Sequence, residues 1–171
     1  MDLKAKFQDI QAVIFDVDGV FTDGSVQLFP DGSVVRTLNS RDGFAVQYAA
    51  RKGLAMYVIT GGNSEQVKER LEALGIRRVI LSASDKWEVF QHLAIEESLQ
   101  AETVLYMGDD LPDYEVMQQV GMSACPEDAA SEIQQLADYI SPLAGGKGCV
   151  RDLLEQVLRS KRQWNDGDNT W

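Results

Sequence analysis

Two aspartates separated by one residue follow a short apolar run near the start of the chain. Residues 12–15 are all apolar, which is typical of a strand buried on both faces, and Asp16 and Asp18 come directly after them. Side chains two residues apart on a strand share a face, so these carboxylates can divide the work of nucleophile and proton donor. Carboxylates at the end of an apolar strand are costly unless compensated, and a divalent cation is the obvious compensator. The alternative is a pair of turn-capping aspartates, since Asp and Gly dominate turns.

Three other polar residues stand where expected strands end or the next helix opens. Thr60 follows the strand expected at 54–59, Lys86 opens a helix, and Asp109 follows the strand expected at 103–107. The carboxyl ends of parallel strands lie on one edge of an α/β sheet, where ligands bind. We therefore expect these side chains to meet the first aspartates at a single mouth.

The residue types at this mouth fit phosphoryl chemistry. Asp109 could join Asp16 on one Mg²⁺ ion, which prefers an octahedral shell of oxygen ligands. The hydroxyl of Thr60, at a helix N-terminus, and the ammonium of Lys86 could hold phosphate oxygens. Asp113, four residues after Asp109, could orient a neighbouring carboxylate or a metal-bound water. Read singly, Thr60 is more often a turn residue and Lys86 an exposed helix lysine, so the prediction depends on the joint pattern.

Strands that alternate with helical segments predict an α/β fold with a doubly wound, Rossmann-like parallel sheet. A β-hairpin is expected after the first strand, because alternating runs at 25–29 and 33–38 flank a Pro-Asp-Gly turn. We expect Asp42 to cap the helix that follows, and Asn63 with Gln66 to form a capping box at the next one. The remaining expected strands lie at 79–81, 122–125 and 139–140. One further helix is expected to begin at residue 84 or 85, and three others are expected at 111–120, 128–137 and 149–160.

The composition is that of an ordinary globular protein, with 171 residues, 44% of them hydrophobic and 25% charged. We expect one domain at residues 1–160 and a polar, disordered tail at 161–171. The formal net charge of −11 argues against nucleic-acid binding and means that an anionic substrate needs local positive charge. Cys125 and Cys149 could form one disulfide, but the composition favours a reduced, cytoplasmic protein, and no apolar run is long enough to span a membrane.

From residue 12 to about residue 152, the chain resembles the haloacid dehalogenase superfamily of phosphohydrolases. The motifs are Asp-Val-Asp-Gly-Val-Phe-Thr-Asp-Gly at 16–24, Thr60, Lys86 and Gly-Asp-Asp-Leu-Pro-Asp at 108–113. The hairpin and two further stretches resemble phosphatases of 3-deoxy-D-manno-octulosonate 8-phosphate (Kdo 8-phosphate), which serve bacterial lipopolysaccharide synthesis. These stretches are Leu-Asn-Ser-Arg-Asp-Gly-Phe at 38–44 and Ala-Gly-Gly-Lys-Gly-Cys-Val-Arg-Asp at 144–152.

This resemblance implies a two-step phosphatase reaction. Asp16 would be the nucleophile and would form an aspartyl-phosphate. Asp18 would protonate the leaving sugar oxygen and then activate water. Thr60 and Lys86 would hold the phosphoryl group.

The resemblance also implies Mg²⁺ as the cofactor. Asp16 and Asp109 would supply carboxylate ligands, and Asp18 would supply its backbone carbonyl. Asp110 and Asp113 would support the metal site.

Little chain separates the motifs, so we expect no cap domain. The ~40 residues from 19 to 59 hold only a hairpin and a helix. The resembling phosphatases are homotetramers in which the C-terminal segment reaches a neighbour's site, and Gly145, Gly146, Lys147 and Arg151 fit that role. A flexible hinge before the last helix is the alternative interpretation.

One position departs from the family pattern. The family often has Thr-Gly-Arg where this chain has Thr-Gly-Gly at 60–62. The missing arginine leaves open how the carboxylate of a sugar acid is bound, and Arg70, Arg41 or Lys147 could substitute. The expected substrate-binding set is Arg41, Gly61, Arg70, Lys147 and Arg151.

The leading hypothesis is therefore a Mg²⁺-dependent phosphatase of Kdo 8-phosphate. A related nine-carbon sugar acid 9-phosphate is the alternative substrate, suggested by the altered Gly62-Asn63 pair. A receiver-type signalling domain also uses Asp, Thr, Lys and Mg²⁺ on a parallel sheet, but it needs neither the early Asp-x-Asp nor the hairpin. A non-catalytic scaffold would not need the full set of catalytic residues.

Overall fold

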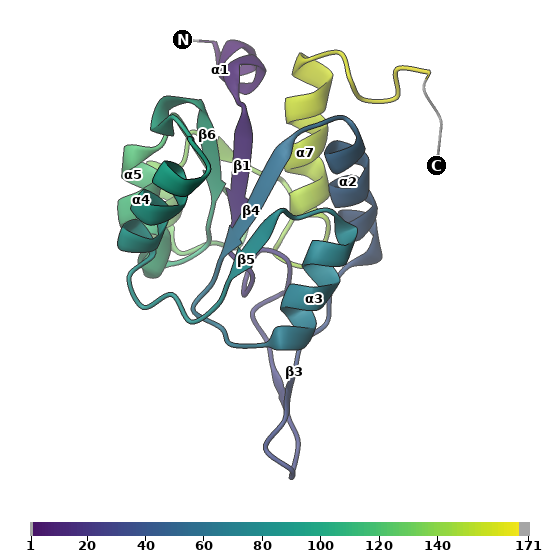
Figure 1. Ribbon diagram of the computed structural model, residues 1–171, viewed down its shortest axis with the longest axis vertical. Coiled ribbons are helices and arrows are strands. Elements are labelled where there is room, and N and C mark those ends of the chain that lie inside the picture. The colour runs from purple at the N-terminus through teal and green to yellow at the C-terminus, as the bar shows by residue number, and fades with distance from the viewer. Residues whose placement is uncertain (1, 168–171) are drawn as a thin grey trace.

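A six-stranded parallel sheet forms the centre of the protein, as the sequence predicted. The computed structural model describes residues 2–167 (Figure 1). The strand order is β5-β4-β1-β6-β7-β8, so the first strand lies in the middle of the sheet. The strands are β1 (Ala12–Phe15), β4 (Ala55–Ile59), β5 (Arg78–Ile80), β6 (Val104–Met107), β7 (Met122–Cys125) and β8 (Tyr139–Ile140).

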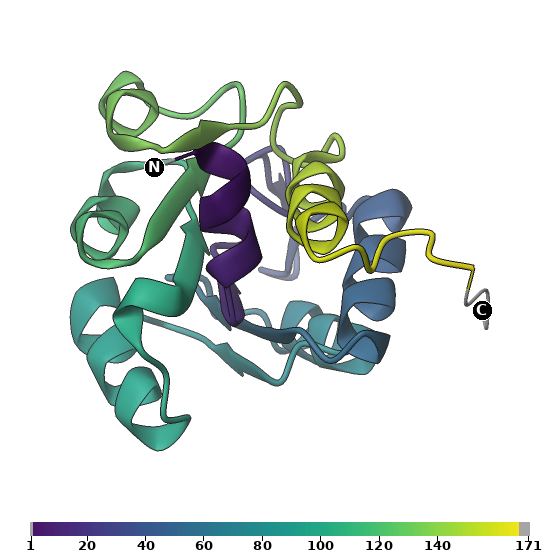
Figure 2. The ribbon, with the colours of Figure 1, turned by 90° about the horizontal axis from the view of Figure 1, so that it is seen from above.

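Helices cover both faces of this sheet (Figure 2). One face packs against α1 (Leu3–Asp9), α2 (Ser40–Arg51), α3 (Glu65–Leu74) and α7 (Cys149–Ser160). The other packs against α4 (Lys86–Glu96), α5 (Tyr114–Gln119) and α6 (Ser131–Leu136), and short 3₁₀ turns occupy Ala101–Thr103 and Leu111–Asp113. None of the helices in the described part of the chain is long and apolar enough to cross a membrane.

The central strand is buried on both faces. Val13 and Phe15 belong to the core beneath α2 and α7, whereas Ala12 and Ile14 belong to the core beneath α4 and α5. Phe15 lies opposite Val58 of β4 and Met107 of β6. The residues that follow these three strands therefore leave the sheet side by side at its carboxyl edge.

The expected β-hairpin projects away from the body of the domain (Figure 1). Its paired strands, β2 (Gln27–Leu28) and β3 (Val34–Val35), are shorter than the alternating runs predicted. The hairpin has apolar side chains that are largely exposed, with Leu28 at 76% and Phe29 at 48% relative exposure. A two-stranded ribbon lacks a second layer on which to bury them.

Two predicted helix caps were wrong. Asn39, not Asp42, caps α2, and its side chain accepts the backbone N–H groups of Arg41 and Asp42. Ser64, not Asn63, caps α3. Both helices begin where an extended residue can fold its own side chain back over the first turn.

Residues 161–167 depart from the disorder expected of the tail. The centroid of the Trp164 ring lies 4.7 Å from that of the Tyr48 ring, and the tail packs against α2. Lys52, which caps the C-terminus of α2, also forms an ion pair with Asp166 at 2.9 Å. Residues 168–171 of the expected tail lie outside the described residues.

Asp42 is instead buried inside the first turn of α2, where it joins that helix to α7. One carboxylate oxygen accepts the backbone N–H of Arg151 at 2.8 Å, and the other is buried without a hydrogen-bond partner. Burial raises the pKa of Asp42 to about 6, although hydrogen bonds from the α7 N-terminus oppose this rise. The ionised form is therefore costly in the folded state.

Replacing Asp42 by Asn should remove a pH dependence of stability. The native protein binds a proton at Asp42 below about pH 6, whereas the unfolded chain binds it only near pH 4, so wild-type folding is favoured as the pH falls. We expect the wild type to gain about 1 kcal/mol relative to Asp42→Asn between pH 7 and pH 5. Urea unfolding of both proteins at the two pH values measures this. The contributions of the other titrating groups to the free energy of unfolding cancel when the two proteins are compared. Equal pH dependence of this free energy in the two proteins would contradict the prediction.

Candidate active site

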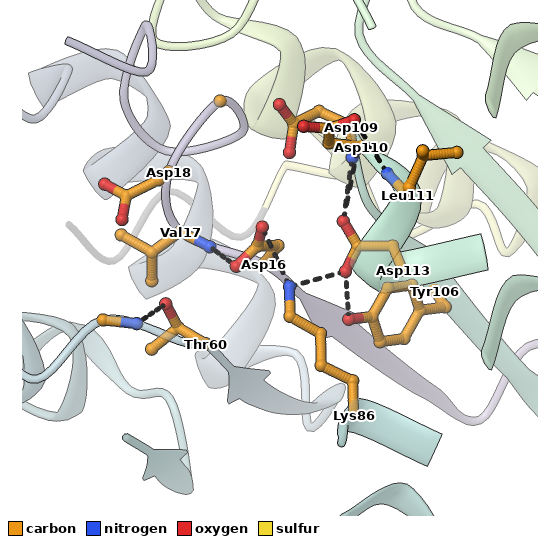
Figure 3. Close-up of polar contacts among 12 residues, drawn as sticks. Asp16, Val17, Asp18, Thr60, Lys86, Tyr106, Asp109, Asp110, Leu111 and Asp113 are labelled. Carbon is orange, nitrogen blue, oxygen red and sulfur yellow. Dashed lines mark hydrogen bonds and ion pairs between the residues drawn. The ribbon is translucent and has the colours of Figure 1, made fainter. Parts of the chain in front are cut away.

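The structure brings the predicted polar residues together at the carboxyl edge of the sheet (Figure 3). Asp16 and Asp18 come from the loop after β1, Thr60 follows β4, and Asp109 follows β6. Lys86 is the first residue of α4. These side chains line one open hollow, together with Gly61, Gly62, Asp110 and Asp113.

Lys86 is the positive centre of this hollow. Its ammonium lies 3.0 Å from Asp16 and 2.7 Å from Asp113, and the residue is only 5% exposed. A buried lysine in the first helical turn is unfavourable, because the helix dipole is positive there. Burial lowers the pKa of Lys86, but the carboxylates of Asp113 and Asp16 outweigh that effect and raise it. The lysine therefore stays charged beside the nucleophile candidate.

Asp113 holds the site together from behind. One of its oxygens accepts Lys86 and the hydroxyl of Tyr106, each at 2.7 Å. The other accepts the backbone N–H of Asp109 at 3.1 Å and lies 3.5 Å from that of Asp110. With both oxygens occupied by donors, Asp113 is placed to orient the loop after β6 rather than to react.

A cluster of carboxylates faces the lysine. Oxygens of Asp16, Asp109 and Asp113 lie within 4.8 Å of one another. Burial and repulsion from Asp113 raise the pKa of Asp16 to about 6, although Lys86 opposes the rise. Burial and repulsion from Asp16 and Asp113 raise the pKa of Asp109 to about 8. One lysine does not neutralise this group, so the oxygen-rich donor set fits a hard divalent cation.

Gly19 allows Asp109 to approach Asp16. Its φ is +87°, and a Cβ atom built on it would lie 1.9 Å from a carboxylate oxygen of Asp109. Any side chain at this position would be strained and would displace the aspartate. The glycine after Asp-x-Asp is therefore required by the site as well as by the turn.

Thr60 lies in a pair of loops fixed to each other by backbone hydrogen bonds. Ala83 donates to the Thr60 carbonyl at 3.0 Å, and Ser82 donates to the Gly62 carbonyl at 2.9 Å. The Thr60 hydroxyl accepts the N–H of Gly62 at 3.1 Å, and the residue is 3% exposed. The hydroxyl is thereby oriented at the rim, where it can donate to an anion.

Asp18 does not point into the carboxylate cluster. Figure 3 shows its side chain directed away from Lys86 and Asp113. Arg36, just after β3, donates to both of its oxygens, with Nε–Oδ1 at 2.7 Å and Nη2–Oδ2 at 3.1 Å. The sequence analysis did not find Arg36, because the hairpin pattern gives no sign of which residue turns back towards the first strand.

The predicted substrate-binding residues are scattered. Gly61 lines the main hollow, but Arg41, Lys147 and Arg151 line a different hollow beside α7. Arg70 is exposed on α3. The substrate-binding roles of these residues stay predictions.

Known proteins resemble both the sequence and the fold. Residues 78–151 match the model of haloacid dehalogenase-like hydrolases. The chain is 35% identical over 157 residues to the 3-deoxy-D-manno-octulosonate 8-phosphate phosphatase KdsC of Escherichia coli K12, covering 92% of this chain and 84% of that protein. The chain belongs to the haloacid dehalogenase-like hydrolases. The enzyme class that the motifs predicted, a phosphatase, is thereby confirmed.

Solved structures of these phosphatases superpose over nearly the whole chain. The crystal structure of the phosphatase from Yersinia pestis has a TM-score of 0.91 and 31% identity, covering 94% of this chain and 87% of that one. The phosphatase from Moraxella catarrhalis, crystallised with a magnesium ion, a phosphate ion and a KDO molecule, has a TM-score of 0.90 and 27% identity, covering 94% and 92%. The capless α/β architecture is therefore that of these neighbours.

Added Mg²⁺ should stabilise the protein through the carboxylate cluster. At a Mg²⁺ concentration one hundred times the Kd, binding adds about 2.7 kcal/mol, which raises the Tm by roughly 5–10 °C. Asp109→Asn should lose most of this rise, and thermal melts of each protein with and without Mg²⁺ measure it. Glu115→Gln makes the same acid-to-amide change at an exposed position on α5 and should keep the full rise. An unchanged Mg²⁺ response in Asp109→Asn would contradict the assignment.

Proposed function

We propose that this enzyme hydrolyses Kdo 8-phosphate to Kdo and phosphate, using Mg²⁺ and an aspartyl-phosphate intermediate. The observation that carries the proposal is the buried Asp16–Lys86 pair, 3.0 Å apart, in a hollow lined with carboxylates and Thr60. The resemblance to KdsC over 92% of the chain supports the substrate. The place of the reaction in lipopolysaccharide precursor synthesis belongs to the same proposal.

In the first step, Asp16 attacks phosphorus and the bond from phosphorus to the sugar oxygen breaks. Asp18 supplies the proton to that oxygen, and Kdo leaves. In the second step, Asp18 takes a proton from water, whose oxygen attacks phosphorus and releases phosphate from Asp16. Lys86 and Thr60 stabilise the charge on the phosphoryl oxygens throughout.

The donor set of the hollow supports Mg²⁺ as the cofactor. Asp16 and Asp109 would bind it with the backbone carbonyl of Asp18, while Asp113 fixes the Asp109 loop and Asp110 lies exposed beside it. Bound there, Mg²⁺ supplies positive charge to the phosphoryl oxygens. The acidic cluster alone would repel a phosphate dianion, which is why the site needs this charge.

A homotetramer in which neighbouring subunits cover the site remains part of the proposal. The exposed apolar side chains of the hairpin, Leu28 and Phe29 among them, support subunit contacts there. Both cysteines, Cys125 and Cys149, are buried free thiols, in keeping with the proposed cytoplasmic location.

A nine-carbon sugar acid 9-phosphate is the second candidate substrate. Gly62 and Asn63 stand in place of the arginine that often follows Thr-Gly, and this departure from the family pattern is what suggests a different sugar acid. A comparison of kcat/KM on the two sugar acids distinguishes them. We expect at least a tenfold preference for Kdo 8-phosphate, on the order of that given by one fitted contact. A preference for the nine-carbon compound would overturn the choice of substrate but not the reaction.

Asp16→Asn should abolish turnover and leave the fold intact. An amide is a poor nucleophile, so kcat should fall at least about a thousandfold. The fold should survive because Lys86 keeps its 2.7 Å ion pair with Asp113. Phosphate release measures the loss, and circular dichroism and thermal melting check the fold. Asp31→Asn, at the exposed hairpin turn, is the matched control and should keep wild-type turnover.

A further inference from the structure

Arg36 lines two hollows beside the catalytic residues. One hollow beside the catalytic residues is lined by Asp18, Arg36, Thr60 and Gly62, and another continues between the hairpin and α3. Both include Arg36, and among the described residues that line them it is the only lysine or arginine. In a chain of net charge −11, Arg36 is therefore the cation that the lining of these two hollows offers to an anionic group.

The pair between Arg36 and Asp18 conflicts with the proposed chemistry. Both oxygens of Asp18 accept guanidinium N–H groups, at 2.7 and 3.1 Å. A carboxylate engaged in this way cannot also give a proton to a leaving oxygen and take one from water. Asp18 must therefore leave Arg36 during each turnover.

A substrate carboxylate can release Asp18 without leaving a charge unpaired. The Arg36 side chain is 11% exposed, so loss of its partner would leave a partly buried cation. Exchange of one carboxylate for another preserves the bidentate geometry and the charge balance. A sugar phosphate without a carboxylate offers no such exchange, so the Arg36–Asp18 pair would have to break with no new partner for the guanidinium.

Arg36 also lies beside position 62, where the family often has an arginine and this chain has Gly62. A Cβ atom on Gly62 would lie 3.3 Å from Nη2 of Arg36 and 3.5 Å from Oδ2 of Asp18. A long side chain at position 62 would therefore compete for the space that the guanidinium fills. Arg36, at the end of the hairpin, therefore supplies the positive charge that the loop after β4 lacks beside Gly62.

We propose that Arg36 is a specificity-determining residue that pairs with Asp18 in the free enzyme and transfers to the carboxylate of the sugar-acid substrate. This exchange couples recognition of the acid group to the release of Asp18 for proton transfer. The inference rests on the proposed function and deepens it. It assigns to Arg36 the role for which the sequence offered Arg70, Arg41 or Lys147.

The test compares an acidic and a neutral substrate. For wild type, Arg36→Ala, Arg36→Lys and the control Arg159→Ala, kcat/KM is measured on Kdo 8-phosphate and on mannose 6-phosphate, which lacks a carboxylate. Arg36→Ala should lose about 10- to 100-fold on Kdo 8-phosphate and gain on mannose 6-phosphate, since Asp18 is freed. Arg36→Lys should fall between Arg36→Ala and wild type. Arg159→Ala, which changes an exposed residue of α7, should keep the wild-type ratio.

Parallel losses on both substrates, or no change on either, would overturn the assignment of Arg36. Calorimetric binding of Kdo gives a readout that does not depend on turnover. Wild type should bind Kdo and Arg36→Ala should bind it at least about tenfold more weakly, whereas equal binding or no wild-type binding would overturn the assignment. Failure of wild type to hydrolyse any phosphomonoester with Mg²⁺ would count against the proposed function instead. Thermal melts confirm that each variant is folded.

Discussion

The ammonium of Lys86 is the interaction on which the site depends. It lies at the start of α4, between the carboxylates of Asp16 and Asp113, and so connects the loops after β1 and β6 across the sheet edge. The charge is 5% exposed and is placed at the positive end of a helix, where it is stable only because the carboxylates surround it. The same carboxylates repel one another and gain from the lysine. The buried lysine and the buried carboxylates therefore stabilise one another, and none of them could remain charged in this position without the others.

The sheet register provides the geometry for this arrangement. Phe15 lies level with Val58 and Met107, so the chain leaves three neighbouring strands at the same height. Thr60, Asp16 and Asp109 then follow within two residues of the strand ends. A slip of one residue in the pairing would move each side chain of β1 from one core to the other and would separate these groups. The two cores therefore fix the relative positions of the catalytic loops as well as stabilising the fold.

Local sequence patterns predict much of this arrangement, but not all of it. The parallel sheet could be predicted because apolar runs such as 12–15 and 54–59 end at polar residues, and right-handed crossovers bring those ends together. The cap of α2 was misplaced because Asn39 and Asp42 are equally good capping residues, and only the burial of Asp42 against α7 separates them. Arg36 could not be found because its partner, Asp18, lies 18 residues away across a hairpin whose twist no local pattern specifies. Contacts of this kind depend on tertiary packing, which sequence periodicity does not report.

None of the side chains assigned to the chemistry belongs to a strand or to a helix interior. Asp16, Asp18, Thr60 and Asp109 lie in loops, and Lys86 is the first residue of its helix. The scaffold of strands and helices and the loops at the carboxyl edge are therefore under different constraints during evolution. A methyl group lost from the interior lowers the amount of folded enzyme but leaves each surviving molecule equally active. A substitution in the loops at the rim alters what each molecule can do, so new substrates can be acquired by changes in these loops.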